Sequence, residues 1–196
     1  MTAALAALAL ALVSSTGAAR APACTPPGAS APEAGARPCD PAVRARTLEL
    51  LGAIDRPIRP ETWRALGPDA EPVLAEVAAS DALPTRRALA LEGLAAIGGA
   101  RAEKLHRSLA ADTHEPRAVR RAAIRGLGRL VPREKLDATL RPLLERDPDR
   151  GVRAGAAEVL SRRSPASSCA AIRAQARREG TAGSGLFARA LAACER

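Results

Sequence analysis

The chain repeats itself over residues 80–163, and this internal repeat constrains its fold more than any other feature. Four segments align on three columns, one of arginine, one of leucine and one of small residues. The arginine column is Arg44, Arg87, Arg120 and Arg153; the leucine column is Leu51, Leu94, Leu127 and Leu160; the small column is Thr47, Ala90, Ala123 and Ala156. The spacing is 33 residues for the last two intervals and 43 for the first. A fixed period of this length is typical of solenoids, in which each unit buries its apolar face against the next.

Helix signals recur within each unit. Asp40 is a good N-cap and Pro41 a good first residue, and apolar residues then recur at helical spacing. The same reading predicts helices at 40–54, 61–66, 71–79, 84–97, 101–111, 115–131, 133–146, 149–163, 165–178 and 186–193, with a turn at Gly180–Gly185. We therefore expect residues 40–196 to form an all-α domain, a right-handed α-solenoid (α–α superhelix) of stacked antiparallel helix pairs.

One motif suggests a family. Residues 147–160 read aspartate–proline, then valine–arginine, then paired alanines and leucine, and the pattern returns near Asp40 and near Val119. It resembles the HEAT repeat, and more narrowly the HEAT-like repeats named after the phycobilisome lyases. The resemblance implies a protein-interaction scaffold with an armadillo-type fold. A lyase-like or enzyme-accessory role is the alternative that the family's name implies, although no chromophore pocket is evident.

The arginine column has a structural interpretation. An aspartate precedes each of the arginine-bearing helices, and these aspartates are Asp40, Asp81, Asp112 and Asp147. We expect each guanidinium of the column to lie against such an aspartate, or against carbonyl groups of an adjacent turn. Arg44, Arg87, Arg120 and Arg153 would then form a ladder that holds the repeats together and takes no part in catalysis.

A second set of charged residues is the candidate partner-binding surface. Glu49, Glu92 and Glu158 share a column with Arg125, and Arg121 lies one turn before Arg125. In HEAT-like arrays this side of the second helices lines the concave face. Stacked helices lie about 8–10 Å apart, too far for the carboxylate pair of a retaining glycosidase, about 5–5.5 Å. We expect the row to face a protein partner, and a solvated helix face without a ligand is the plain alternative.

Nucleic acid is a further alternative, because the chain has a formal charge of +9 and the helix at 115–131 is rich in arginine. This helix carries Arg117, Arg120, Arg121, Arg125 and Arg129. Aromatic residues make up only 1% of the chain, so there is little to stack on bases. We therefore favour a protein partner of unknown identity.

No sequence motif predicts catalysis. The segment Gly180–Gly185 lacks the Lys-Ser/Thr pair of a phosphate-binding loop, and no serine sits in a Gly-x-Ser-x-Gly elbow. His106 and His114 have no evident nucleophile partner, and the cysteine spacings do not suggest zinc. We expect no catalytic residue, no metal and no cofactor.

The N-terminal segment predicts export. Residues 1–23 have the apolar run and small-residue end of a signal peptide, and residues 24–39 form a Pro/Ala-rich linker. We expect a periplasmic or secreted protein without a transmembrane span. Cleavage after Ala23 would expose Cys24 for a lipid anchor, an alternative that Ala21 disfavours because bacterial lipoprotein signals usually carry leucine there.

Four cysteines agree with export, because an even number behind a signal peptide predicts disulfides. A Cys24–Cys39 bridge would tie the linker to the first helix. The last two predicted helices form an antiparallel hairpin that places Cys169 level with Cys194, so we expect these two residues to pair.

Overall fold

The computed structural model describes residues 40–53 and 57–196, apart from the side chains of 181–184. This part of the chain is helical and contains no strand. Its helices are α1 (Pro41–Gly52), α2 (Pro60–Ala65), α3 (Ala70–Ala78), α4 (Pro84–Ile97), α5 (Ala100–Ala111), α6 (Arg117–Leu130), α7 (Arg133–Arg146), α8 (Arg150–Arg163) and α9 (Pro165–Ala193). The predicted all-α fold is confirmed. The predictions for the signal peptide (1–23), the linker (24–39), Cys24 and Cys39 concern residues outside the described part.

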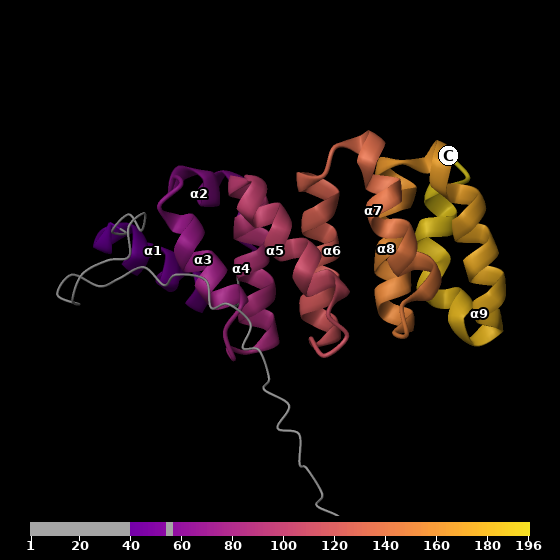
Figure 1. Ribbon diagram of the computed structural model, residues 1–196, viewed down its shortest axis with the longest axis horizontal. Coiled ribbons are helices and arrows are strands. Elements are labelled where there is room, and N and C mark those ends of the chain that lie inside the picture. Colours follow the sequence, from indigo (N-terminus) through magenta and orange to yellow (C-terminus); the bar gives the residue numbers. More distant parts are fainter. Residues whose placement is uncertain (1–39, 54–56) are drawn as a thin grey trace, which may run out of the picture.

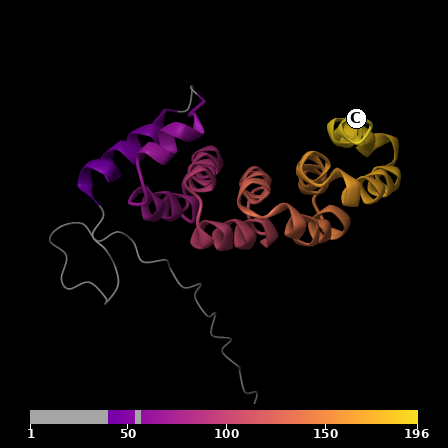
Figure 2. The ribbon, with the colours of Figure 1, turned by 90° about the horizontal axis from the view of Figure 1, so that it is seen from above.

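Successive helices stack as antiparallel pairs along one axis (Figure 1). The pairs are α3 with α4, α5 with α6, α7 with α8, and the two halves of α9. Viewed from above, the stack is an arc, with α4, α6 and α8 along its inner side and α3, α5 and α7 along its outer side (Figure 2). The structure is therefore an α-solenoid, as the repeat predicts, and its second helices line the concave face.

The aligned columns form the core. Thr47, Ala90, Ala123 and Ala156 of the small column are all fully buried, and no residue of the leucine column exceeds 1% exposure. Small residues allow neighbouring second helices to approach closely, and the leucines fill the space between the layers. Each repeat thus buries its apolar stripe against the next, which makes the core continuous along the stack.

Helix starts follow the local sequence. The Asp40 carboxylate accepts a hydrogen bond from the backbone N–H of Ala42 at 2.8 Å, and Pro41 is the first residue of α1, as the sequence predicts. The Asp149 carboxylate caps α8 in the same way, accepting from the N–H of Val152 at 3.0 Å. Burial raises the pKa of Asp149, but hydrogen bonds from Arg117 and Val152 outweigh it, so the pKa lies below its ordinary value.

A buried histidine joins three helices. The His106 side chain on α5 is fully buried, with Nδ1 2.7 Å from the carbonyl oxygen of Ala102 and Nε2 3.0 Å from that of Leu91 on α4. A Cβ atom at Gly126 of α6 would lie 2.1 Å from the imidazole ring, so glycine is required there. The sequence predicted no role for His106, and the structure gives it a packing position between helices.

The C-terminal hairpin differs from its prediction in one respect. The expected turn at Gly180–Gly185 is wrong, because the backbone is helical on both sides of Gly180 and breaks at that residue alone. Gly180 has φ 65°, a left-handed conformation that glycine adopts without strain. The two halves of α9 are still antiparallel, and Cys169 and Cys194 form a disulfide between them with their Cα atoms 5.6 Å apart.

Candidate functional site

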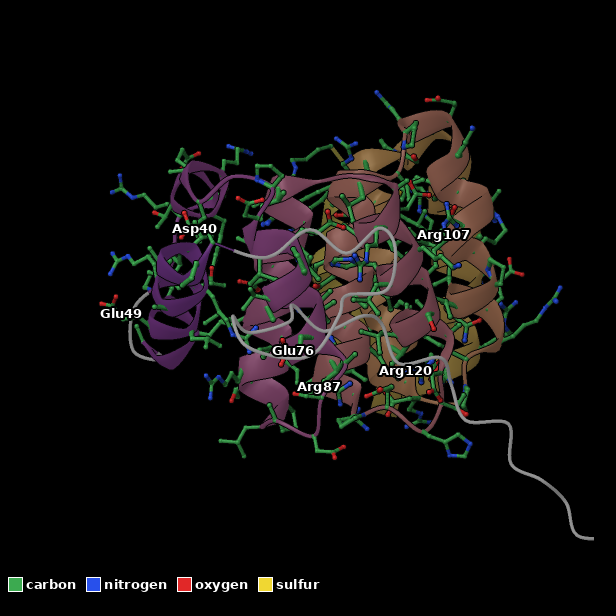
Figure 3. All side chains as sticks on the ribbon, turned by 60° about the vertical axis from the view of Figure 1, so that its left-hand side comes forward. Asp40, Glu49, Glu76, Arg87, Arg107 and Arg120 are labelled. Atoms are coloured by element: carbon green, nitrogen blue, oxygen red, sulfur yellow. A yellow bond between two sulfur atoms is a disulfide. The ribbon has the colours of Figure 1, made fainter. Side chains whose placement is uncertain are left out.

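The arginine ladder, defined as Arg44, Arg87, Arg120 and Arg153, connects each repeat to the next. Each guanidinium reaches an acidic side chain 26 to 32 residues further along the chain. The pairs are Arg44 with Glu76, Arg87 with Glu115, Arg120 with Asp147, and Arg153 with Glu179. Figure 3 shows Glu76, Arg87 and Arg120 following one another along the stack.

Three ladder arginines also bind carbonyl groups at the end of the preceding helix. Arg87 Nε donates to the Ala78 oxygen at 2.8 Å, and Arg120 Nε donates to the Ala110 oxygen at 3.1 Å. Arg153 Nη1 donates to the carbonyl oxygen of Asp147, the C-cap residue of α7, at 2.5 Å, and to that of Pro148 in the following loop at 3.1 Å. These bonds satisfy carbonyls that have no partner within their own helix. Each of these guanidinium groups therefore caps the first helix of its own pair and holds an acid of the next repeat.

The carbonyl contacts predicted for the ladder are confirmed for Arg87, Arg120 and Arg153, but most of the predicted aspartates are wrong. Asp147 is the one aspartate of the predicted set that pairs with a ladder arginine. Asp40 caps α1, and Asp112 accepts from the backbone N–H of His114 at 2.9 Å. Neither of them, nor Asp81, pairs with the ladder. The glutamates that replace them have no fixed place in the repeat, so the columns could not reveal them.

The central pair is the most buried. The Arg120 and Asp147 side chains are 3% and 2% exposed, whereas those of Arg44 and Glu76 are 33% and 39% exposed. At the C-terminal end, hydrogen bonds from Arg153 lower the pKa of Glu179, and the same contact raises the pKa of Arg153. All these contacts lie within the chain and join successive repeats.

The concave row, defined as Glu49, Glu92, Arg121, Arg125 and Glu158, lies mostly on the inner helices. Arg125 on α6 pairs with Glu92 on α4 at 3.2 Å, and Arg121 pairs with Glu158 on α8 at 3.8 Å. Glu158 also lies 3.9 Å from Arg189 in the last half of α9. Charges of opposite sign therefore alternate from one inner helix to the next.

Glu49 stands apart from the other members of the row. It pairs with Arg46 on its own helix at 2.6 Å, and both side chains are more than half exposed. Figure 3 shows Glu49 at the left-hand edge of the view, at the α1 end of the stack. The structure thus brings four of the five residues into contact across repeats and leaves the fifth on a terminal helix.

Two arginine side chains of α6 pack directly against glycines of α8. A Cβ atom at Gly151 would lie 2.8 Å from Cδ of Arg117, and one at Gly155 would lie 3.4 Å from Arg121. Arg117, 64% exposed, crosses to Asp149 at 2.7 Å. Sequence reasoning named Arg117 only as a nucleic-acid contact and missed Asp149 and Arg189, although the glycines at two α8 positions were a signal for close approach.

The described residues include no group of three or more His, Cys, Asp or Glu side chains placed to hold a metal. In the same part of the chain, no helix is long and apolar enough to cross a membrane. An open cavity of about 580 Å³ lies between the first turns of α7 and α9, and two hydrogen bonds join these helices beside it. Ser168 bonds Asp137, and Ser164 bonds the Arg133 carbonyl.

The stacked pairs, the buried small-residue column and the ladder define a helical-repeat solenoid. A family model of HEAT repeats matches residues 106–182, and the chain is a HEAT repeat protein. Comparison with curated proteins and with solved structures gives no match. The narrower resemblance to phycobilisome lyase repeats stays a prediction. HEAT repeats generally mediate protein–protein interaction, which makes the concave face the candidate interaction surface.

Proposed function

We propose that this protein is an exported scaffold that binds another protein through its concave face. The observation that carries the proposal is the alternation of charge across the inner helices, from Glu92 through Arg125 and Arg121 to Glu158. These side chains are between 19% and 48% exposed, so a partner could reach them without unfolding any element. The Cys169–Cys194 disulfide agrees with an extracytoplasmic location, because such bonds persist in oxidising compartments.

The pairing within the row has a consequence for partner recognition. Exposed ion pairs contribute about 0–1 kcal/mol to stability, so the row adds little to the fold. Complementary charge contributes strongly to the rate and specificity of association. A partner with a matching charge pattern can exchange these weak internal pairs for contacts of its own. HEAT scaffolds are typically non-catalytic, and nothing in the geometry favours the lyase-like alternative.

A charge swap tests the proposal. In the double variant Glu92→Arg with Arg125→Glu, the internal pair is retained and the pattern presented to a partner is reversed. We expect an unchanged thermal midpoint and a loss of partner capture from the native envelope fraction. A matched swap of the pair Glu103→Arg with Arg107→Glu on the outer helix α5 is the control. If the Glu92/Arg125 swap captures the same partner as the parent chain, the concave face is not the binding surface.

A further inference from the structure

The two edges of the solenoid differ in how their arginines are neutralised. Loops joining α5 to α6 and α7 to α8 lie at one edge, the lower one in Figure 1, and loops joining α6 to α7 and α8 to α9 lie at the other. At the lower edge Arg117 pairs with Asp149, and Arg150 pairs with Glu179. Carboxylates thus neutralise these two arginines, whereas Arg146 and Arg177 at the same edge are exposed and form no ion pair within the described residues.

The upper edge carries four arginines that we call the rim arginines, Arg129, Arg133, Arg162 and Arg163. All four are exposed. Arg129 lies in the last turn of α6, and Arg162 and Arg163 lie in the last turn of α8. None of them forms an ion pair within the described residues, and neither does Glu134 in the first turn of α7.

Two rim arginines continue the concave row. Arg129 is one helical turn beyond Arg125, and Arg162 is one turn beyond Glu158. Since α6 packs against α8, their axes are separated by about 8–10 Å. The rim is thus a basic border of the same face. The part of the chain that carries the rim is basic as a whole, because residues 117–196 contain 18 Lys and Arg against eight Asp and Glu.

We infer that the rim binds an acidic, extended segment of a protein partner, with carboxylates at Arg129 and Arg162; this deepens the proposed function and rests on it. An extended chain rises about 3.3 Å per residue, so acidic residues two or three positions apart would span the two helices. The excess of basic over acidic residues in 117–196 makes this part of the chain complementary in charge to such a segment.

Other polyanions fit this surface less well. Both aromatic residues among those described, Trp63 and Phe187, are buried, so no aromatic ring is available to stack on nucleic-acid bases. A membrane-bound surface would be expected to expose apolar side chains beside its arginines. The large apolar side chains exposed in the described part, Leu83 and Leu186, precede α4 and begin the last half of α9, both toward the lower edge.

The test is direct binding of a fluorescein-labelled twelve-residue peptide with glutamate at every third position, measured by anisotropy at two salt concentrations. The peptide with glutamine in place of glutamate is the ligand control. We expect Arg129→Gln with Arg162→Gln to weaken binding by about tenfold, because two exposed charge contacts are lost. The control variant Arg146→Gln with Arg177→Gln removes the same charge from exposed arginines at the lower edge and should change binding less than about twofold.

Several results would overturn the inference. Equal weakening by the two double variants would mean that net charge binds the peptide. Tighter binding of oligo-dT or of anionic vesicles, lost in the rim variant, would assign the rim to nucleic acid or to a lipid surface. If native partner capture is abolished by the Glu92/Arg125 swap but unaffected in the rim variant, the rim inference fails while the concave-face proposal stands.

Discussion

Asp147→Ala is the sharpest test of the ladder. This change leaves the Arg120 guanidinium, 3% exposed, with the Ala110 carbonyl but no carboxylate. Breaking a buried pair from one side costs about 3–5 kcal/mol, because an uncompensated charge stays buried. The lost hydrogen bond from the Asp149 N–H, 2.9 Å long, adds about 1 kcal/mol. We expect the free energy of unfolding in urea, followed by far-UV circular dichroism, to fall by the sum of these two losses.

A graded comparison makes this prediction refutable. Glu76→Ala breaks the equivalent but half-exposed pair with Arg44, and should cost no more than about 1 kcal/mol. The double variant Arg120→Met with Asp147→Ala should be less destabilised than Asp147→Ala alone, since no charge remains buried. Equal losses of unfolding free energy for Asp147→Ala and Glu76→Ala would refute the reasoning that burial determines how much each ion pair of the ladder stabilises the fold.

Other perturbations probe the core, the buried imidazole and the hairpin. Leu127→Ala should cost about 2–5 kcal/mol in urea melts, as buried leucine truncations do. Gly126→Ala should cost about 1–3 kcal/mol in the same assay, because its methyl group collides with His106. Burial lowers the pKa of His106, although two backbone hydrogen bonds act in the opposite direction. As the pH falls, the unfolded state therefore binds the proton before the folded state does. The free energy of unfolding should then decrease as the pH drops below about 6.5. Opening the disulfide with Cys169→Ala and Cys194→Ala should cost about 3.5 kcal/mol, the chain-entropy value for a 25-residue loop, and non-reducing peptide mapping of the parent chain should recover the linkage.

The sequence predicted the scaffold well because its signals are periodic. Each column position is filled by the same kind of residue in successive repeats, and each such residue meets the same neighbours in the stack. Leu94 and Leu127 are buried for the same reason, and Ala90 and Ala123 as well. Helix boundaries followed from Pro and Asp at the starts, so most were predicted within a few residues.

The sequence failed where a contact depends on residues outside the columns. Arg44 and Arg120 find their acids 32 and 27 residues ahead, on different elements, so no single offset identifies them. The break at Gly180 was spread over six residues because the glycines around it all suggest a turn. Gly93 and Gly126 share a column and face Leu74 and His106, so a bulky neighbour could have been inferred there.

The concave face itself can be tested with a photo-crosslinking amino acid. Position 125 is an exposed position on the inner helix α6, and position 104, occupied by Lys104, is an exposed position on the outer helix α5. Crosslinking in the native host, with the adduct identified by mass spectrometry, should join a protein partner to position 125 and not to position 104. A partner joined at position 104 alone, or equally at both positions, would contradict the account.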